Sequence, residues 1–115
     1  MILGLDVSTA TIGYSVLDLE GNLKELGYIS LKKQKTLLEK AEEFRSVLVR
    51  LKSNYDFSRV FIEEAFQRYG RGMSSARTIT LLAVFNGIIQ YVNFKELDIT
   101  PELISVSTAR KSCGI

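Results

Sequence analysis

Apolar and polar residues alternate in a strand-like way over the opening part of the chain. Two short apolar runs, over residues 2–5 and 14–17, flank a brief polar segment. Such runs, rich in branched and aromatic side chains, predict two strands joined as a hairpin. A Glu-Gly-Asn turn signal at 20–22 leads into a looser alternation over 23–31. The opening is therefore predicted to form a three-stranded antiparallel meander.

The apolar spacing changes to three and four residues from Thr36 onward. This spacing predicts an amphipathic helix that ends near Ser53, with its apolar face formed by Leu37, Leu38, Ala41, Phe44, Leu48 and Leu51. A short apolar run at 60–62 follows and predicts a buried strand. Because a helix separates this strand from the meander, we expect it to pair in parallel beside the first strand.

The second half of the chain alternates again between loop, helix and strand signals. Two glycines mark a loop over 67–77, and Ser74 or Ser75 is a candidate helix N-cap. The helix expected over about 76–92 is apolar almost all the way round, so one face still needs a partner after the other packs on the sheet. A connection, a last strand over 103–106 and the start of a further helix complete the prediction.

Composition narrows the chemistry that this sequence can perform. With 115 residues, 46% of them hydrophobic, and a single proline, the chain is expected to fold as one compact domain. It has no histidine and only Cys113, which excludes the usual general base, zinc sites and an internal disulfide. Any bound metal should then be held by oxygen ligands, as Mg²⁺ or Mn²⁺ is. A cytoplasmic location without membrane insertion is the expectation, because Asn86 and Gln90 interrupt the most apolar stretch.

Asp6 is the most informative residue of the opening hairpin. The flanking apolar pattern predicts that this carboxylate is buried within the first strand, where a charge is costly unless it is paired. A bound cation would satisfy it. The alternative is that Asp6 caps the turn through the hydroxyls or amides of Ser8 and Thr9.

Three segments together resemble one protein family. They are Ile-Leu-Gly-Leu-Asp-Val-Ser-Thr at 2–9 with Gly-Tyr at 13–14, Phe-Ile-Glu-Glu-Ala-Phe at 61–66, and Ile-Ser-Val-Ser-Thr-Ala-Arg-Lys-Ser-Cys-Gly at 104–114. Their order and spacing resemble the RuvC-like Holliday junction resolvases, particularly the shorter phage-type members. The resemblance implies a ribonuclease H-like α/β fold, with three antiparallel strands followed by two parallel strands and flanking helices.

The resemblance also implies a metal-dependent DNA endonuclease that resolves four-way junctions by paired cuts. Its catalytic and metal-binding carboxylates would be Asp6 and Glu63, which would hold two Mg²⁺ or Mn²⁺ ions roughly 4 Å apart. The resemblance favours Glu63 over Glu64 because Glu63 occupies the family position after Phe61 and Ile62, and alternation turns its neighbour to the other face of the sheet. Without Asp6, the Glu63-Glu64 pair would be read as an ordinary solvated strand end.

The chain departs from the family pattern at its end. Family members carry two further acidic residues on a C-terminal helix, and the sequence stops at Ile115 before such a helix could supply them. The expectation is therefore a nuclease domain over 1–115 that lacks the last catalytic helix. An N-terminal fragment is favoured over a degenerate relative, because a helix that begins at an N-cap and stops within about two turns is an unusual natural terminus. Alone, it should bind metal weakly and cut DNA poorly or not at all.

A basic loop beside the predicted carboxylates suits the phosphate backbone of DNA. The expected DNA-binding residues of this loop are Arg68, Tyr69, Arg71 and Arg77, where the tyrosine could stack on bases. Arg110 and Lys111 match a basic position that the family uses near its active site. The alternative is that these are ordinary surface cations. A homodimer through the helix at about 76–92 would match the two-fold symmetry of a four-way junction.

Two other functions remain open at this point. The Gly-Leu-Asp-Val-Ser-Thr hairpin at 4–9 is also typical of sugar-kinase- or actin-like ATPases, although 115 residues leave no room for their second lobe. The chain could instead be a structure-selective DNA-binding or dimerisation module without cleavage activity. Binding of ATP would favour the former, and junction binding indifferent to Mg²⁺ would favour the latter.

Overall fold

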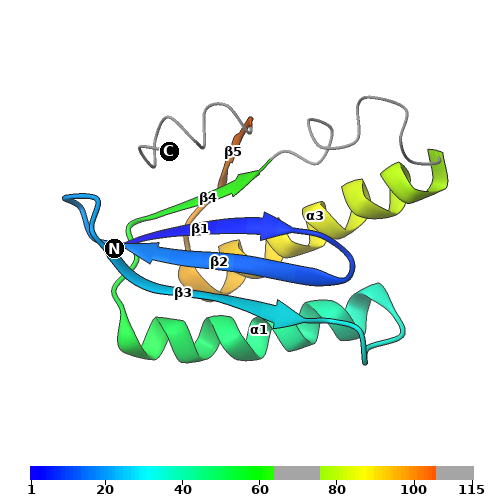
Figure 1. Cartoon of the computed structure of the whole chain (residues 1–115), viewed down its shortest axis with the longest axis horizontal. Helices are drawn as coiled ribbons and strands as arrows, with labels where there is room; N and C mark the ends of the chain where they lie inside the picture. The colour runs from blue at the N-terminus through cyan, green and yellow to red at the C-terminus, as the bar shows by residue number, and fades with distance from the viewer. Residues whose placement is uncertain (64–75, 106–115) are drawn as a thin grey trace.

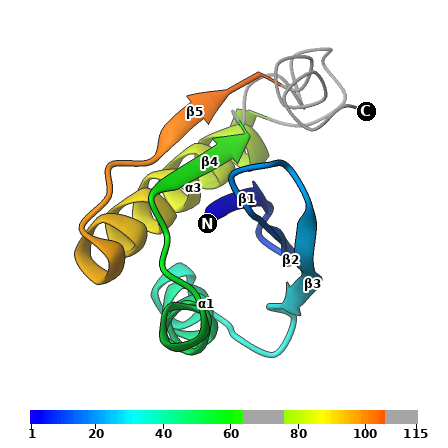
Figure 2. The same ribbon diagram turned by 90° about the vertical axis from the view of Figure 1, so that its left-hand side faces the viewer.

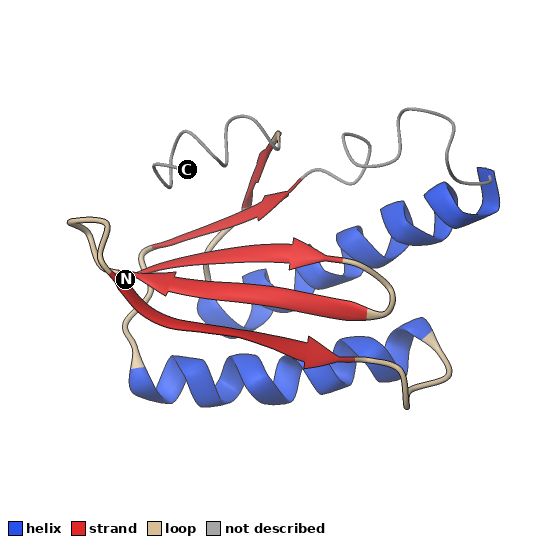
Figure 3. Ribbon diagram, viewed as in Figure 1, coloured by secondary structure: helices blue, strands red, loops and turns tan. Residues whose placement is uncertain are grey.

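A five-stranded mixed sheet forms the centre of the molecule (Figure 1). The computed structural model describes residues 1–63 and 76–105. The elements are β1 (Ile2–Val7), β2 (Thr11–Leu17), β3 (Leu23–Ser30), α1 (Leu37–Asn54), β4 (Arg59–Glu63), α3 (Ala76–Leu97) and β5 (Glu102–Ile104). The strand order is β3-β2-β1-β4-β5, with β1, β2 and β3 antiparallel and with β4 parallel to both β1 and β5. The predicted fold class, the antiparallel meander and the parallel pairing of β4 beside β1 are thereby confirmed (Figure 3).

Both described helices lie on the same side of the sheet (Figure 2). Alternate residues of β1 point toward them, and Leu3, Leu5 and Val7 are accordingly buried. The amphipathic face of α1 contributes Phe44 and Leu48 to the same core. The other face of the sheet is covered by neither α1 nor α3, and this difference between the two faces determines where the polar strand residues lie.

The helix α3 is longer than the sequence pattern predicts. It continues past Val92 to Leu97, through Asn93, which favours turns in many contexts. Here the Asn93 side-chain amide donates to the Ile89 carbonyl at 2.8 Å within the same helix, so the residue is accommodated. The helix ends where Asp98 adopts a positive φ of 56°.

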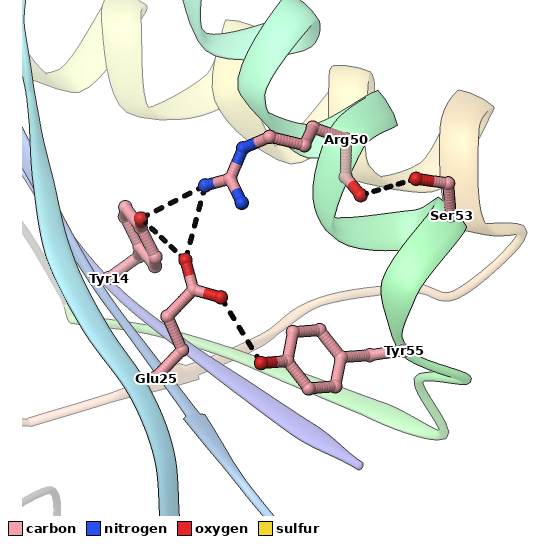
Figure 4. Close-up of polar contacts among 5 residues, drawn as sticks. All are labelled: Tyr14, Glu25, Arg50, Ser53 and Tyr55. Carbon is pink, nitrogen blue, oxygen red and sulfur yellow. Dashed lines mark hydrogen bonds and ion pairs between the residues drawn. The ribbon is translucent and has the colours of Figure 1, made fainter.

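A cluster of four side chains ties α1 to the antiparallel edge of the sheet (Figure 4). The Glu25 carboxylate accepts hydrogen bonds from the Tyr14 hydroxyl at 2.9 Å, the Tyr55 hydroxyl at 3.1 Å and the Arg50 guanidinium at 3.1 Å. Gly27 leaves room for Tyr14, because a Cβ there would come within 2.6 Å of the tyrosine oxygen. Strands β2 and β3 and the end of α1 are thus fixed around one carboxylate.

The Glu25 cluster should make folding stability sensitive to acid. The hydrogen bonds from Tyr14 and Arg50 hold the pKa of the Glu25 carboxyl below its usual value. A lowered pKa contributes stability above the unfolded pKa, and this contribution is lost as pH falls through the folded pKa. We expect Glu25→Gln to cost about 1 kcal/mol near neutral pH and to lose less stability than the wild type on acidification.

Urea unfolding at pH 7 and near pH 3 measures this difference, with Glu20→Gln in the exposed β2–β3 turn as the matched control. Equal acid sensitivity of Glu25→Gln and wild type would contradict the role assigned to the cluster.

Candidate metal centre

Asp6 and Glu63 lie side by side at the carboxyl ends of β1 and β4. These strands are parallel, and Leu5 is paired with Ile62, so the next residue of each strand occupies a neighbouring position. Adjacent strands are spaced roughly 4.8 Å apart. Because Leu5 and Ile62 are buried under the helices, alternation turns both carboxylates to the opposite, uncovered face. Two carboxylates that are far apart in the sequence are therefore neighbours at one end of the sheet.

The predicted burial of Asp6 is wrong, because its side chain is exposed. The flanking residues are buried as expected, but alternate residues of a strand face opposite sides of the sheet. Burial of Asp6 would require an element on the second face, and neither α1 nor α3 lies there. Solvent exposure removes the desolvation cost and leaves the carboxylate accessible to an incoming ion.

The turn that follows Asp6 is held by Ser8. Its hydroxyl donates to the Thr11 carbonyl at 2.8 Å and accepts from the Thr11 backbone amide at 3.1 Å. The side-chain ammonium of Lys40, in α1, also donates a hydrogen bond to the Thr9 carbonyl. The Ser8 hydroxyl therefore closes this turn against Thr11.

The end of β4 is held from the helix side by a pair of amides. The Asn86 side-chain amide donates to the Glu63 carbonyl at 3.3 Å, and Gln90 donates to the Asn86 side-chain oxygen at 2.9 Å. Asn86 is almost completely buried in α3. Sequence reasoning used these residues only as interruptions of an apolar run. The signal that could have revealed them is a pair of amides four residues apart, one of them on the stripe that packs against the sheet.

An open groove of about 610 Å³ runs from the two carboxylates along the uncovered face of the sheet. Its apolar lining includes Ile2, Leu17, Leu26, Phe61 and Ile104. Gly4 and Gly13 are also part of the lining and carry no side chains. Gly13 is paired with Asp6, and a Cβ there would meet the Asp6 Cβ at 3.7 Å, an ordinary contact.

The oxygen donors at this site fit a hard divalent cation. Mg²⁺ commonly keeps several water ligands and is held by one or two carboxylates, which is the number that Asp6 and Glu63 supply. Within residues 1–63 and 76–105, no group of three or more His, Cys, Asp or Glu side chains could hold a metal ion. The described residues thus provide part of a Mg²⁺ ligand set.

Arg77 is the only predicted DNA-binding residue inside the described ranges, and it is exposed in the first turn of α3. Outside the described residues lie Glu64, the candidate caps Ser74 and Ser75, and the remaining predicted DNA contacts, which are Arg68, Tyr69, Arg71, Arg110 and Lys111. Neither α1 nor α3 combines the length and the apolar character that a membrane span requires.

Comparison with solved structures places the fold. No family model matches this sequence, and no curated protein matches it significantly. RuvC of T. thermophilus in complex with a Holliday junction substrate matches 96% of this chain with a TM-score of 0.75 and 11% identity. A Thermus thermophilus RuvC structure also matches 96%, with a TM-score of 0.69 and 16% identity. The chain spans 68% and 66% of these two proteins, respectively. The chain therefore has the ribonuclease H-like α/β fold of RuvC.

Proposed function

We propose that this chain is the metal-binding part of a RuvC-like endonuclease that cuts branched DNA at four-way junctions. The observation that carries the proposal is the adjacency of Asp6 and Glu63 on parallel strands of this fold. A solvent-accessible pair of carboxylates can hold a hydrated divalent cation next to a phosphodiester. The structural similarity to RuvC in complex with a Holliday junction supports the interpretation of this pair of carboxylates as a nuclease site.

In this proposal, Asp6 and Glu63 hold Mg²⁺ or Mn²⁺ on the open face of the sheet. When bound, two such ions activate the attacking water and stabilise the leaving oxygen of the phosphodiester. The carboxylates position the ions, and the amides of Asn86 and Gln90 support the backbone that carries Glu63. Further acidic ligands are proposed to come from outside the described residues, so that this chain alone binds metal weakly.

DNA contacts are proposed for Arg77 and for the predicted basic residues that lie outside the described ranges. Arg77 is exposed and can neutralise a backbone phosphate. The same role is proposed for the other basic residues of the predicted set, with Tyr69 stacking on a base at the branch point. Arginine contacts to phosphate carry no sequence information, which suits an enzyme that selects the shape of its substrate.

A homodimer through α3 would present two such sites to one junction. Apolar residues that remain exposed along this helix include Leu81, Val84 and Tyr91, spaced three and seven residues apart on one face. A two-fold interface of this kind matches the symmetry of a four-way junction. We expect Val84→Glu, at a side chain 50% exposed, to convert a dimer into monomers.

Sedimentation equilibrium of the purified chain measures this change in mass. Val49→Glu in α1, where the valine is 42% exposed, is the matched control and should leave the mass unchanged. A wild-type chain that is monomeric at all accessible concentrations would refute the α3 interface.

The proposed activity is tested with a labelled four-way junction and a linear duplex of the same sequence. The 115-residue chain should bind the junction more tightly than the duplex. The longest natural reading frame that contains it should cut the junction symmetrically with Mg²⁺ or Mn²⁺. Junction binding that is indifferent to metal, without cutting by that longer form, would identify a non-catalytic binding module instead.

A further inference from the structure

Three exposed lysines follow β3, in the segment 32–35 that leads into α1. They are Lys32, Lys33 and Lys35, and none of them forms an ion pair with another residue that the structure describes. Like charges this close repel one another, so a cluster without acidic partners is stabilised by an anionic ligand. The 32–35 segment is therefore a candidate anion-binding surface outside the carboxylate site.

The 32–35 segment lies at the same end of the sheet as the candidate metal centre. Figure 1 shows the start of α1 at the end where β1 and β4 finish. Asp6 is paired with Gly13, and Gly13 with Tyr28, so one row of residues runs from the carboxylate to β3. With strands roughly 4.8 Å apart and about 3.3 Å per residue, the lysines lie roughly 10–20 Å from Asp6. One DNA strand covers this distance with roughly three to six nucleotides, at about 3.4 Å each.

The backbone of the segment is held at both ends. Leu31 is completely buried, and its amide donates to the Ala10 carbonyl in the β1–β2 turn at 2.9 Å. The Gln34 amide donates to the Leu31 carbonyl at 3.2 Å and closes a turn around the first two lysines. Thr36 then caps α1, because its hydroxyl accepts from the Glu39 amide at 3.1 Å. With the backbone already ordered, a ligand has only the lysine side chains to immobilise, which lowers the entropic cost of binding.

Charge is distributed unevenly between the two ends of the sheet. At the carboxyl ends of β1 and β4, the described cations outnumber the acids Asp6, Glu39 and Glu63, because Lys40 and Arg77 join the three lysines. At the opposite end, lysines are accompanied by acidic residues that include Asp18, Glu20, Asp56 and Asp98. A polyanion is therefore attracted to the end that carries the metal centre and repelled by the other.

We propose that the 32–35 segment binds the phosphate backbone of the DNA arm next to the cut site, several nucleotides from the phosphate at the metal centre. The inference rests on the proposed nuclease function and deepens it, because it names the part of the substrate that reaches the end of β3. A lysine ammonium on its flexible stem binds phosphate as a point charge. Such contacts fix the orientation of the arm and carry no sequence information.

The first test measures how salt affects binding of a four-way junction by the 115-residue chain. Fluorescence anisotropy gives the slope of log K against log salt concentration, which changes by about 1 for each phosphate contact removed. The combined variant Lys32→Gln, Lys33→Gln and Lys35→Gln should lower the magnitude of the slope by about 2 to 3. It should also bind at least about tenfold more weakly at about 50 mM salt. Arginine at the same three positions keeps the charge and should retain the wild-type slope.

The matched control removes the same charge from the opposite end of the molecule. It combines Lys24→Gln, Lys52→Gln and Lys95→Gln, at exposed lysines near the start of β3 and in the last turns of α1 and α3. Its slope should equal that of the wild type. An equal loss in both combined variants would mean that only the net charge of the chain matters.

A second substrate tests the position of the contact on the DNA. In this junction, the phosphates roughly three to six nucleotides from the crossover are replaced by neutral methylphosphonates. The wild type should bind it at least about tenfold more weakly than the unmodified junction. The 32–35 glutamine variant should bind both junctions equally, because it has already lost the lysines that contact those phosphates.

Three outcomes would overturn the inference. They are a wild-type slope in the 32–35 glutamine variant, an equal loss in the matched control, and a methylphosphonate effect that the 32–35 glutamine variant retains. Mn²⁺ titration of the wild type separates the two proposals. Metal binding and junction preference together with any of these outcomes would refute the 32–35 contact alone, whereas a wild type without metal binding and junction preference would refute the nuclease function.

Discussion

Asp6→Asn is expected to abolish metal-dependent cutting of a four-way junction while leaving junction binding nearly intact. The amide keeps the size of the side chain but removes its negative charge, so the side chain becomes a weaker ligand for Mg²⁺. Loss of a residue that only orients a metal ligand typically costs 10- to 100-fold in metal affinity or activity. Loss of a direct ligand should therefore lower the cutting rate by at least about 100-fold.

Cleavage is measured on the longest natural reading frame under single-turnover conditions, and Mn²⁺ affinity on the 115-residue chain. Asp56→Asn, an exposed aspartate that precedes β4, is the matched control and should cut normally. Because Asp6 is exposed, its substitution should change the free energy of unfolding little. Cutting at the wild-type rate by Asp6→Asn would show that this carboxylate does not hold the metal.

Phe85→Ala is expected to have the largest effect on stability, about 3–5 kcal/mol. The ring is completely buried in α3, in the core cluster that also contains the buried residues of β1 and β4. Its removal leaves a cavity that the surrounding side chains fill only in part. The loss is a large part of the 5–15 kcal/mol that holds a typical domain together.

Urea denaturation followed by circular dichroism measures the loss. Phe94→Ala is the matched control, because this ring of the same helix is 46% exposed and should cost much less. Phe85 also adjoins Asn86, which holds the carbonyl of Glu63, so weaker Mn²⁺ binding should accompany the loss of stability. Similar unfolding free energies for the two variants would mean that α3 is not anchored by Phe85.

Local pattern was sufficient to predict the order of the elements and the position of the candidate site. Strands with period two and helices with period 3.6 are encoded by neighbouring residues, so β1 to β4 and α1 could be predicted from spacing alone. Because a helix connects the meander to β4, β4 was expected to pair with β1 in the parallel direction. This pairing sets the ends of β1 and β4 side by side, and with them Asp6 and Glu63.

Contacts between distant residues could be decided only by the tertiary structure. Exposure of Asp6 depends on which face of the sheet the helices cover, and this is not encoded in the residues around it. The Glu25 cluster unites β2, β3 and α1, and the groove unites residues of all five strands. Periodicity determines which face of its own element a residue occupies, but the packing of the elements determines what lies opposite that face. Neighbouring residues were thus enough to predict the fold class and the pairing of Asp6 with Glu63, whereas the packing of both helices on one face of the sheet set the exposure of Asp6 and the residues around it.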